Sequence, residues 1–419
     1  MIQEITIENY KSIQSLSIEL GRVTVFIGEN GCGKSNILEA IALGSAAAAD
    51  KLDNEFLAPR GIRVTDPKLM RSAFDINNLE QQIKISFKSN RDGILSYSLN
   101  HTNDLYSEWV KNSNLWNINT RNQAKKKLEE QLNLFKMNRK KVESNIQQIL
   151  EMTNSSFDKI FDEIFNINKK LDDEFFDINK KFDEVQEDLG KRAVQQDLLE
   201  NNFLVFCLEL TELKEFSREG QIEPLGIKGQ GLFKYLRYLS QAQFKEKLDE
   251  IKEKLELIDW FEDFEIPDNL YPGERTLKIK DRYLDPDLEY FDQKSANEGF
   301  LFLLFYFCLF IGEETPKFFA IDNIDSSLNP RLCRRLIQEL VELAKKYDKQ
   351  VILTTHNPAI LDGLDLDDQE QKLYVIKRKR SGQTRAIQIF TPKPLPDQEP
   401  VPLSEAFLRG YIGGLPKNF

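Results

Sequence analysis

The stretch Val23-Thr24-Val25-Phe26-Ile27-Gly28-Glu29-Asn30-Gly31-Cys32-Gly33-Lys34-Ser35 decides the fold. Its first five residues are β-branched or aromatic and predict a buried strand, while the next eight match the pattern GxxxxGK[ST]. Glycines in such a loop let backbone N–H groups turn inward around phosphate oxygens, because no side chains obstruct the approach. We therefore expect a phosphate-binding loop between this strand and a helix that begins at Lys34.

The loop residues predict a nucleotide and a metal ion. Lys34 would neutralise the β- and γ-phosphates of ATP, and Ser35 would offer its hydroxyl to Mg²⁺. The residues expected to contact the nucleotide are Gly28, Glu29, Asn30, Gly31, Cys32, Gly33, Lys34, Ser35 and Asn36.

The acidic residue that should complete this site lies far along the chain. An apolar strand is predicted at Phe318–Ile321, and it ends in Asp322, which we expect to be a partner of Mg²⁺. A second strand at Val351–Leu353 leads into Thr354-Thr355-His356. The imidazole of His356 could hydrogen-bond the γ-phosphate or the attacking water, or it could be a structural histidine. Both ends of the chain are thus predicted to build one site around a large insertion.

Composition limits the class of protein. A chain of 419 residues can hold two or three domains, and 30% charged with 41% hydrophobic residues fits a globular protein with long exposed helices. The longest apolar run, Phe300–Ile311, is shorter than the roughly 18 to 20 residues that span a bilayer and predicts a buried helix. With no leader pattern at the start and four scattered cysteines, we expect a cytoplasmic protein. A net charge of −11 argues against indiscriminate duplex binding and makes a protein partner at least as probable as nucleic acid.

The expected fold class is α/β. Residues 1–100 and 276–390 form the two lobes of a nucleotide-binding head, with a mixed sheet, helices and an antiparallel β subdomain. Residues 101–275 are expected to form a helical insertion, and the proline-rich residues 391–419 a docking tail.

Two amphipathic stripes at residues 120–189 predict an antiparallel coiled-coil hairpin. Residues 121–152 carry eight basic and four acidic side chains, and 157–189 carry five and eleven, so the segments are electrostatically complementary. Two ordinary helices folded onto the body of the protein are the alternative.

The two ends of the chain resemble the head of ABC-type ATPases of the SMC, RecF and OLD-like group of the AAA family. The residues that carry the resemblance are the phosphate-binding loop, Asp322, the Thr354-Thr355-His356 segment and the entry motif Ile7-Glu8-Asn9-Tyr10-Lys11-Ser12-Ile13. The ATPase subunits of bacterial anti-phage systems such as PARIS and Septu are similar as well, including in the terminal segment 408–416.

The chain departs from the pattern of that group beside Asp322. The group normally has a glutamate there that orients the attacking water, whereas this chain has Asn323. An amide cannot accept the proton, so we expect slow hydrolysis unless Asp325 takes over. Alternatively, Asn323 still positions water through its carbonyl and Asp325 is a loop residue.

The resemblance also implies a signature segment that reaches the γ-phosphate of a second subunit. The candidates are Ser295, Asn297 and Gly299, which precede the apolar helix but lack the usual LSGGQ-like text. Two subunits would then have to meet head to head, because neither would carry a complete site.

Two weaker signals stay open. Gln81 and Gln82 are either a Q-loop ligand of Mg²⁺ or the start of an exposed strand. Lys377-Arg378-Lys379-Arg380 either contacts nucleic acid or keeps a hairpin edge soluble.

The resemblance implies an ATPase that acts as a nucleotide-dependent sensor or scaffold in anti-phage defence. It would restrain or release a separate effector, such as a nuclease, in response to a phage-encoded trigger. The alternatives are an SMC- or RecF-like ATPase that binds DNA, the cytosolic ATPase of a transporter, and a nucleotide-locked structural protein. No membrane partner is expected.

Overall fold

The computed structural model describes residues 1–89, 93–104, 107–115, 118–152, 157–216, 222, 224–267, 271, 274–285, 287–391 and 401–413. Two compact units make up the chain, and each is described by itself. The first contains Met1–Phe87, Ser96–Asn112 and Asp197–Phe419, and the second contains Lys88–Leu95 and Ser113–Gln196. The connection between the two segments of the expected hairpin, at 153–156, and most of the expected docking tail, at 392–400 and 414–419, lie outside the described residues.

A six-stranded sheet carries the phosphate-binding loop. Its order is β14-β13-β3-β12-β11-β7, and all neighbours from β13 to β7 run parallel, whereas β14 pairs antiparallel with β13. The strands are β3 (Val23–Ile27), β7 (Val205–Phe206), β11 (Phe318–Ile321), β12 (Gln350–Thr355), β13 (Gln371–Arg378) and β14 (Thr384–Ile389).

The register of this sheet brings the predicted motifs to one edge. Ile27 pairs with Thr355, and Ile321 pairs with Leu353, so β3, β11 and β12 end at nearly the same level. Parallel strands present their carboxyl ends together, and ligands of such sheets bind outside those ends. The loop after β3 and the residues after β11 and β12 therefore share one edge.

A five-stranded sheet has the order β2-β1-β4-β5-β6. Its first two strands come before the phosphate-binding loop in sequence, and the other three come after it. Alternating burial along β1 gives it one apolar face, and Ile5 and Ile7 pair across to Ile18 and Leu16 of β2. The strands are β1 (Ile2–Tyr10), β2 (Ile13–Glu19), β4 (Ile83–Ser89), β5 (Ile94–Asn100) and β6 (Val110–Ser113). A three-stranded sheet has the order β10-β9-β8, with β8 (Phe261–Glu265), β9 (Lys278–Asp281) and β10 (Phe291–Asp292).

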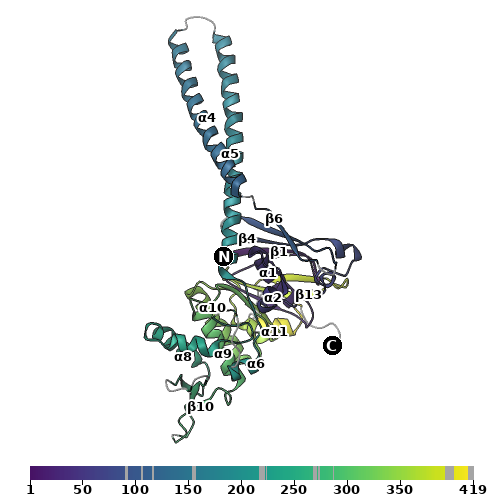
Figure 1. The fold of residues 1–419 in the computed structure, drawn as a ribbon, viewed down its shortest axis with the longest axis vertical. Coiled ribbons are helices and arrows are strands. Elements are labelled where there is room, and N and C mark those ends of the chain that lie inside the picture. The colour runs from purple at the N-terminus through teal and green to yellow at the C-terminus, as the bar shows by residue number, and fades with distance from the viewer. Residues whose placement is uncertain are drawn as a thin grey trace. The chain divides into compact units, whose positions relative to one another are not determined.

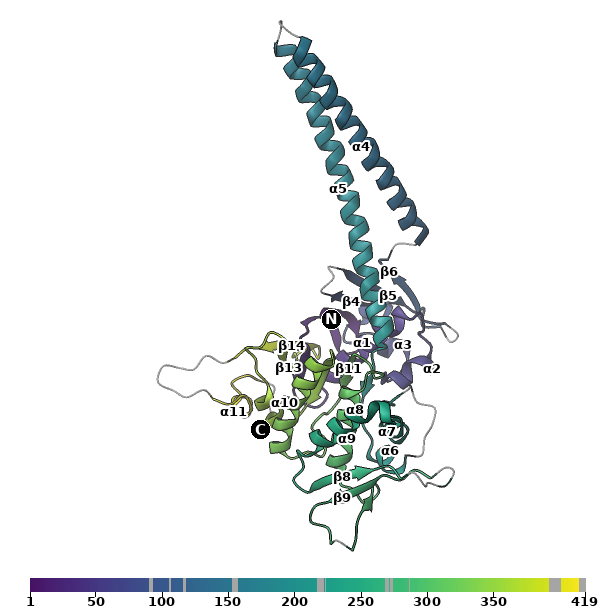
Figure 2. The same cartoon turned by 90° about the vertical axis from the view of Figure 1, so that its left-hand side faces the viewer.

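Helices of the first unit pack with the parallel sheet around one core. The helix α9 (Glu298–Ile311) is buried from Phe300 through Ile311, as its apolar sequence predicts, and it contacts α8 and α10 (Figure 2). The other helices are α1 (Lys34–Ala48), α2 (Asn54–Leu57), α3 (Pro67–Met70), α6 (Leu210–Glu215), α7 (Leu232–Leu239), α8 (Lys245–Leu255), α10 (Pro330–Lys346) and α11 (Leu403–Leu408), with 3-10 turns at Ala58–Arg60, Ile76–Glu80, Ala242–Phe244 and Pro358–Gly363.

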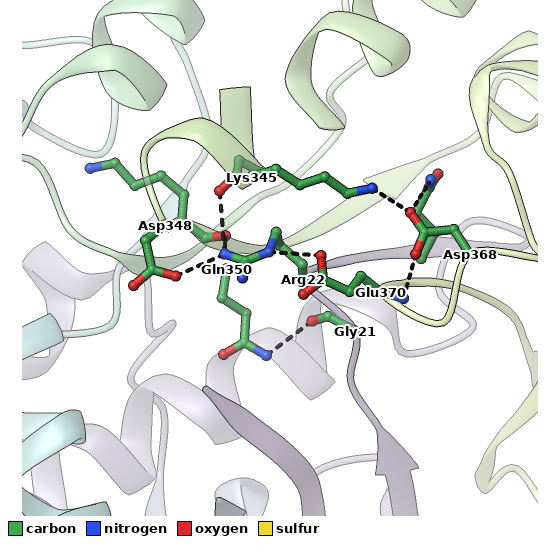
Figure 3. A network of polar contacts seen from close by, with 10 residues as sticks. Gly21, Arg22, Lys345, Asp348, Gln350, Asp368 and Glu370 are labelled. Atoms are coloured by element: carbon green, nitrogen blue, oxygen red, sulfur yellow. Dashed lines mark hydrogen bonds and ion pairs between the residues drawn. The ribbon is translucent and has the colours of Figure 1, made fainter. Parts of the chain in front are cut away.

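Polar contacts tie the start of the chain to its C-terminal part (Figure 3). Arg22, just before β3, donates from Nη1 to Asp348 Oδ1 at 2.9 Å and from Nε to Glu370 Oε2 at 3.1 Å. The buried Gln350 donates from Nε2 to the carbonyls of Ile2 at 2.7 Å and Gly21 at 3.0 Å. Residues more than three hundred positions apart therefore belong to one core.

The second unit consists mainly of two long helices, α4 (Ile118–Met152) and α5 (Phe157–Asn201). The C-terminal end of α5, from Asp197, belongs to the first unit. They lie side by side and antiparallel (Figure 1). Phe135 and Phe175 have ring centroids 5.5 Å apart, and Lys181 Nζ donates to Gln131 Oε1 at 3.3 Å. Residue numbers that rise on one helix fall on the other, which is the pairing expected of a hairpin.

The segment 101–275 is not helical throughout. It also holds β6, β7 and β8, and β7 joins the parallel sheet beside β11. A two-residue strand is too short to show a periodic pattern, so sequence analysis missed it. Within the described part of the chain, every helix is too short or too polar to cross a membrane.

Candidate nucleotide-binding site

The phosphate-binding loop depends on glycines at two crowded positions. Gly33 has φ +109°, and a Cβ there would lie 2.1 Å from Thr384 Oγ1; a Cβ on Gly28 would lie 2.1 Å from the carbonyl oxygen of Ile376. Gly31 has φ +71° with open space around it. At position 31, only the positive φ favours glycine. At position 33, a positive φ and the lack of space for a Cβ both favour glycine.

Lys34 folds back onto the loop. Its Nζ donates to the carbonyls of Gly28 at 2.8 Å and Glu29 at 3.1 Å, and the residue is buried. Burial lowers the pKa of Lys34, and the nearby Cys32 and Asp322 oppose that shift. The loop carbonyls thus hold the ammonium group where a phosphate oxygen could replace them.

The predicted metal partners are in direct contact. Ser35 Oγ donates to Asp322 Oδ2 at 2.8 Å. Mg²⁺ prefers oxygen ligands and is usually held by one or two carboxylates together with phosphates and water. A hydroxyl beside a carboxylate at the end of a phosphate-binding loop fits that ion, and these two residues would hold it.

Two threonines of β12 hold the carboxylates of this edge, and sequence reasoning gave neither of them a role. Thr354 Oγ1 donates to Asp322 Oδ1 and accepts from the Asn323 N–H at 2.9 Å. Thr355 Oγ1 donates to Asp325 Oδ1 at 2.6 Å. The motif that drew attention to His356 therefore also orients both acids after β11.

Asn323 sits in a left-handed backbone conformation with φ +57°. Its carbonyl accepts from Ser326 N at 3.1 Å and Ser326 Oγ at 2.9 Å. Asparagine tolerates this conformation better than most residues. The residue that replaces the usual glutamate is therefore also suited to the tight turn after β11.

His356 follows β12 at the same edge. The pKa of His356 is lowered by partial desolvation and by the charge of Lys34, although Asp325, Asp322 and a backbone hydrogen bond at Gly28 oppose the shift. Because all of these groups belong to the loop or the acidic edge, the imidazole lies among the predicted site residues.

The signature candidates make contacts within their own chain. Asn297 caps α9 by accepting from Phe300 N at 2.8 Å, and Ser295 donates its N–H and hydroxyl to Asp292 Oδ1. A Cβ on Gly299 would lie 3.1 Å from the carbonyl oxygen of Ser327, so this helix end packs against the loop after β11. Their role toward a second subunit stays a prediction.

A cavity of about 370 Å³ adjoins the phosphate-binding loop. Arg378 of β13 donates from Nε to the Gly31 carbonyl at 2.9 Å, and its guanidinium lies 5.4 Å from the Phe74 ring centroid. The basic run ends β13 at Arg378 and leads into the turn of the β13–β14 hairpin. Its role, contact with nucleic acid or solubility of the hairpin, stays a prediction. The described lining consists of Lys11, Ser12, Asn36, Arg63, Thr65, Leu69, Arg71, Ala73, Phe74 and Arg378. Four of these side chains are cationic and none is a carboxylate.

The entry motif builds the wall of this cavity. The buried Asn9 donates to the carbonyls of Asn78 at 2.9 Å and Gln81 at 3.0 Å, and it accepts from Ser72 N at 3.0 Å. Ser12 Oγ accepts from Asn36 Nδ2 at 2.7 Å. The motif therefore joins the segment before β4 to the first turn of α1.

The segment of Gln81 and Gln82 contributes through its backbone. Gln81 and Gln82 each accept from Asn9 through a carbonyl, and β4 begins one residue later, at Ile83.

The fold and the site define a P-loop ATPase. The chain matches the family described as "AAA domain, putative AbiEii toxin, Type IV TA system" over residues 23–362, and it belongs to that family. No curated protein matches the chain.

Solved SMC heads are similar in structure. An SMC head bound to the C-winged helix domain of ScpA is 12% identical, with a TM-score of 0.50 over 93% of this chain and 98% of that one. The SMC head with an extended coiled coil from Pyrococcus furiosus, bound to the C-terminal domain of ScpA, is 14% identical, with a TM-score of 0.45 over 93% and 96%. The SMC head domain from Thermotoga maritima is 13% identical, with a TM-score of 0.42 over 93% and 98%. At 12% identity, the likeness to the SMC head bound to the C-winged helix domain of ScpA shows an SMC-head type of fold and gives no information on function.

Proposed function

We propose that the chain binds Mg²⁺-ATP at the edge where β3, β11 and β12 end. The contact between Ser35 and Asp322 supports this best, because it places a hydroxyl and a carboxylate together beside the phosphate loop. The triphosphate would lie against Gly28–Ser35, and Lys34 would exchange loop carbonyls for phosphate oxygens. The cationic cavity beside Asn36 would receive the remainder of the nucleotide.

Turnover should be slow, so the ATP-bound state would be the functional one. Asn323 offers an amide where a general base is needed. Asp325 is a carboxylate two residues on, but it already accepts a hydrogen bond from Thr355. His356 would contact the γ-phosphate or the attacking water. Slow turnover is tested by comparing the rate of single-turnover hydrolysis of radiolabelled ATP with the rate of nucleotide release. Hydrolysis much faster than release would contradict a long-lived ATP-bound state.

Two heads would close around two nucleotides. Ser295, Asn297 and Gly299 of each head would contact the γ-phosphate of the nucleotide bound to the other head. The N-terminus of α9 supports this because helix N-terminal N–H groups favour anions. Light scattering with and without Mg²⁺-ATP measures the assembly. A Gly299→Asp variant should stay monomeric, whereas assembly that ignores both nucleotide and this substitution would contradict the arrangement.

The biological role would be that of a nucleotide-dependent sensor or scaffold in anti-phage defence, acting on a separate effector such as a nuclease. The resemblance to defence ATPases supports this, and the family's description mentions a toxin of a TA system. Phage plating on cells that carry the chain with its neighbouring genes tests it. Protection should vanish with Lys34→Ala and survive the exposed-lysine control Lys245→Ala; equal protection by both variants would contradict the proposal.

A second candidate is an SMC-like ATPase that binds DNA. One observation favours it: α4 exposes Lys125, Lys126, Lys127, Lys136, Lys140 and Lys141. Contacts between lysines and phosphates would make DNA affinity fall steeply with salt concentration. A gel-shift assay with and without Mg²⁺-ATP decides, and an absence of binding at low salt would eliminate this candidate.

A further inference from the structure

A buried carboxylate on α1 holds two cations beside the phosphate loop. Glu39 is 2% exposed, yet it receives Lys11 Nζ on Oε2 and Arg63 Nε on Oε1. Tyr10 Oη also donates to Oε2 at 3.3 Å. Both carboxylate oxygens of Glu39 are therefore hydrogen-bonded inside the protein.

The two cations extend from Glu39 toward the cavity. Arg63 Nη2 donates to Asn36 Oδ1 at 3.1 Å, and Asn36 directly follows the predicted Mg²⁺ ligand Ser35. Lys11 Nζ donates to the Arg63 carbonyl at 3.0 Å, so each cation helps to place the other. Both side chains line the 370 Å³ cavity, and the Arg63 side chain keeps 65% of its surface exposed.

The charge balance of the cluster leaves attraction for an anion. Glu39 neutralises one of its two cations, and Arg71 and Arg378 add positive charge to the same lining. Burial lowers the pKa of Lys11, and the charge of Glu39 opposes that shift. Without the carboxylate of Glu39, the cations of Lys11 and Arg63 would repel each other in a partly desolvated environment, and their side chains would move apart.

We infer that Glu39 is a positioning residue for the nucleotide. It fixes Lys11 and Arg63 so that they meet the ribose and base of ATP, the parts beyond the triphosphate that Lys34 and Ser35 would hold. Glu39 itself does not touch the ligand, because it is buried and its charge would repel phosphate. This inference rests on the proposed ATP site and adds a residue that selects a nucleoside triphosphate over a bare triphosphate.

The test compares two ligands on the full-length chain. Calorimetry would measure the Kd of Mg²⁺-ATP and of Mg²⁺ with inorganic triphosphate, for wild type, Glu39→Gln and the exposed-carboxylate control Glu55→Gln. Charge-assisted contacts have energies that correspond to about tenfold or more in affinity. We expect Glu39→Gln to weaken ATP at least about tenfold while inorganic triphosphate changes less than about twofold, and Glu55→Gln to match wild type.

Other outcomes separate the possible failures. An unchanged ATP affinity in Glu39→Gln, or equal losses for both ligands, would overturn the inference, since equal losses mean that α1 and its loop have been damaged. If Glu39→Gln does not fold, Arg63→Gln replaces it and must show the same selective loss; no selective loss there overturns the inference too. Wild type that binds neither ligand would refute the proposed ATP site itself.

Discussion

Ser35 Oγ lies 2.8 Å from Asp322 Oδ2, although the two residues are 287 positions apart in sequence. The parallel pairing of β12 with both β3 and β11 produces this contact, because it aligns the ends of the two strands that carry the residues. The polar network of Arg22 with Asp348 and Glu370 joins the same segments at residues that precede the strands. The predicted site is thus one edge of one sheet, built by both parts of the chain.

Replacing Gly33 by alanine should abolish nucleotide binding, whereas Gly31→Ala should weaken it mildly. Both glycines have positive φ, but only the Cβ at position 33 would meet Thr384 Oγ1, at 2.1 Å. Backbone strain costs about 1–3 kcal/mol at such positions, and the clash adds to it in Gly33→Ala. Calorimetric titration with Mg²⁺-ATP checks this, and equal affinities in the two variants would contradict the packing account.

Replacing Asn323 by glutamate should raise the hydrolysis rate, because a carboxylate can accept the proton that an amide cannot. General-base catalysis typically contributes about 10²- to 10⁴-fold, but the left-handed φ of +57° disfavours glutamate and will reduce the gain. Phosphate release under saturating ATP measures the effect, with Asn323→Gln as the uncharged control. Equal and substantial rates in wild type and Asn323→Glu would refute the role assigned to Asn323.

Asp368 should make the protein sensitive to acid. Partial burial would raise its pKa, but the hydrogen bond from Lys345, with those from Glu370 N and Gln371, lowers it to about 2. The folded state therefore binds this proton less readily than the unfolded state, in which the pKa is about 3.9. The stabilisation is present above about pH 4 and is lost as the pH falls toward 2.

The matching measurement is the free energy of unfolding of wild type and Asp368→Asn at pH 6 and pH 3. The gap should be about 1–2 kcal/mol at pH 6, after allowance for solvent screening, and should shrink at pH 3. The exposed Asp367→Asn, which alters a contact to Thr391, serves as the control. A gap that stays constant with pH would contradict the assigned pKa shift.

Sequence reasoning reached the parts of the site with strong local patterns. The loop after β3 and the acid after β11 follow from short motifs on apolar strands, and they lie together as expected. The cavity could not be predicted, because Lys11, Arg63, Phe74 and Arg378 come from four separate segments that converge only through tertiary packing.

Part of the cavity wall does carry a sequence signal, in the entry motif. The entry motif was recognised as a family resemblance, whereas its physical meaning lies in its partners: Asn9 holds the segment before β4, and Lys11 meets Glu39. Thr354 and Thr355 precede His356 in sequence, and their hydroxyls orient Asp322 and Asp325. Such contacts depend on strand register, which a single sequence does not reveal.

The central claim is that Ser35 and Asp322 jointly hold Mg²⁺ for one ATP. A double-mutant cycle of Ser35→Ala and Asp322→Asn tests it, with the Kd of ATP measured calorimetrically at saturating and zero Mg²⁺. We predict that each single variant loses most of the Mg²⁺-dependent affinity and that the double variant loses little more, because the two residues act on the same ion. Strictly additive losses, or ATP affinity that does not depend on Mg²⁺ in the wild-type protein, would contradict the claim.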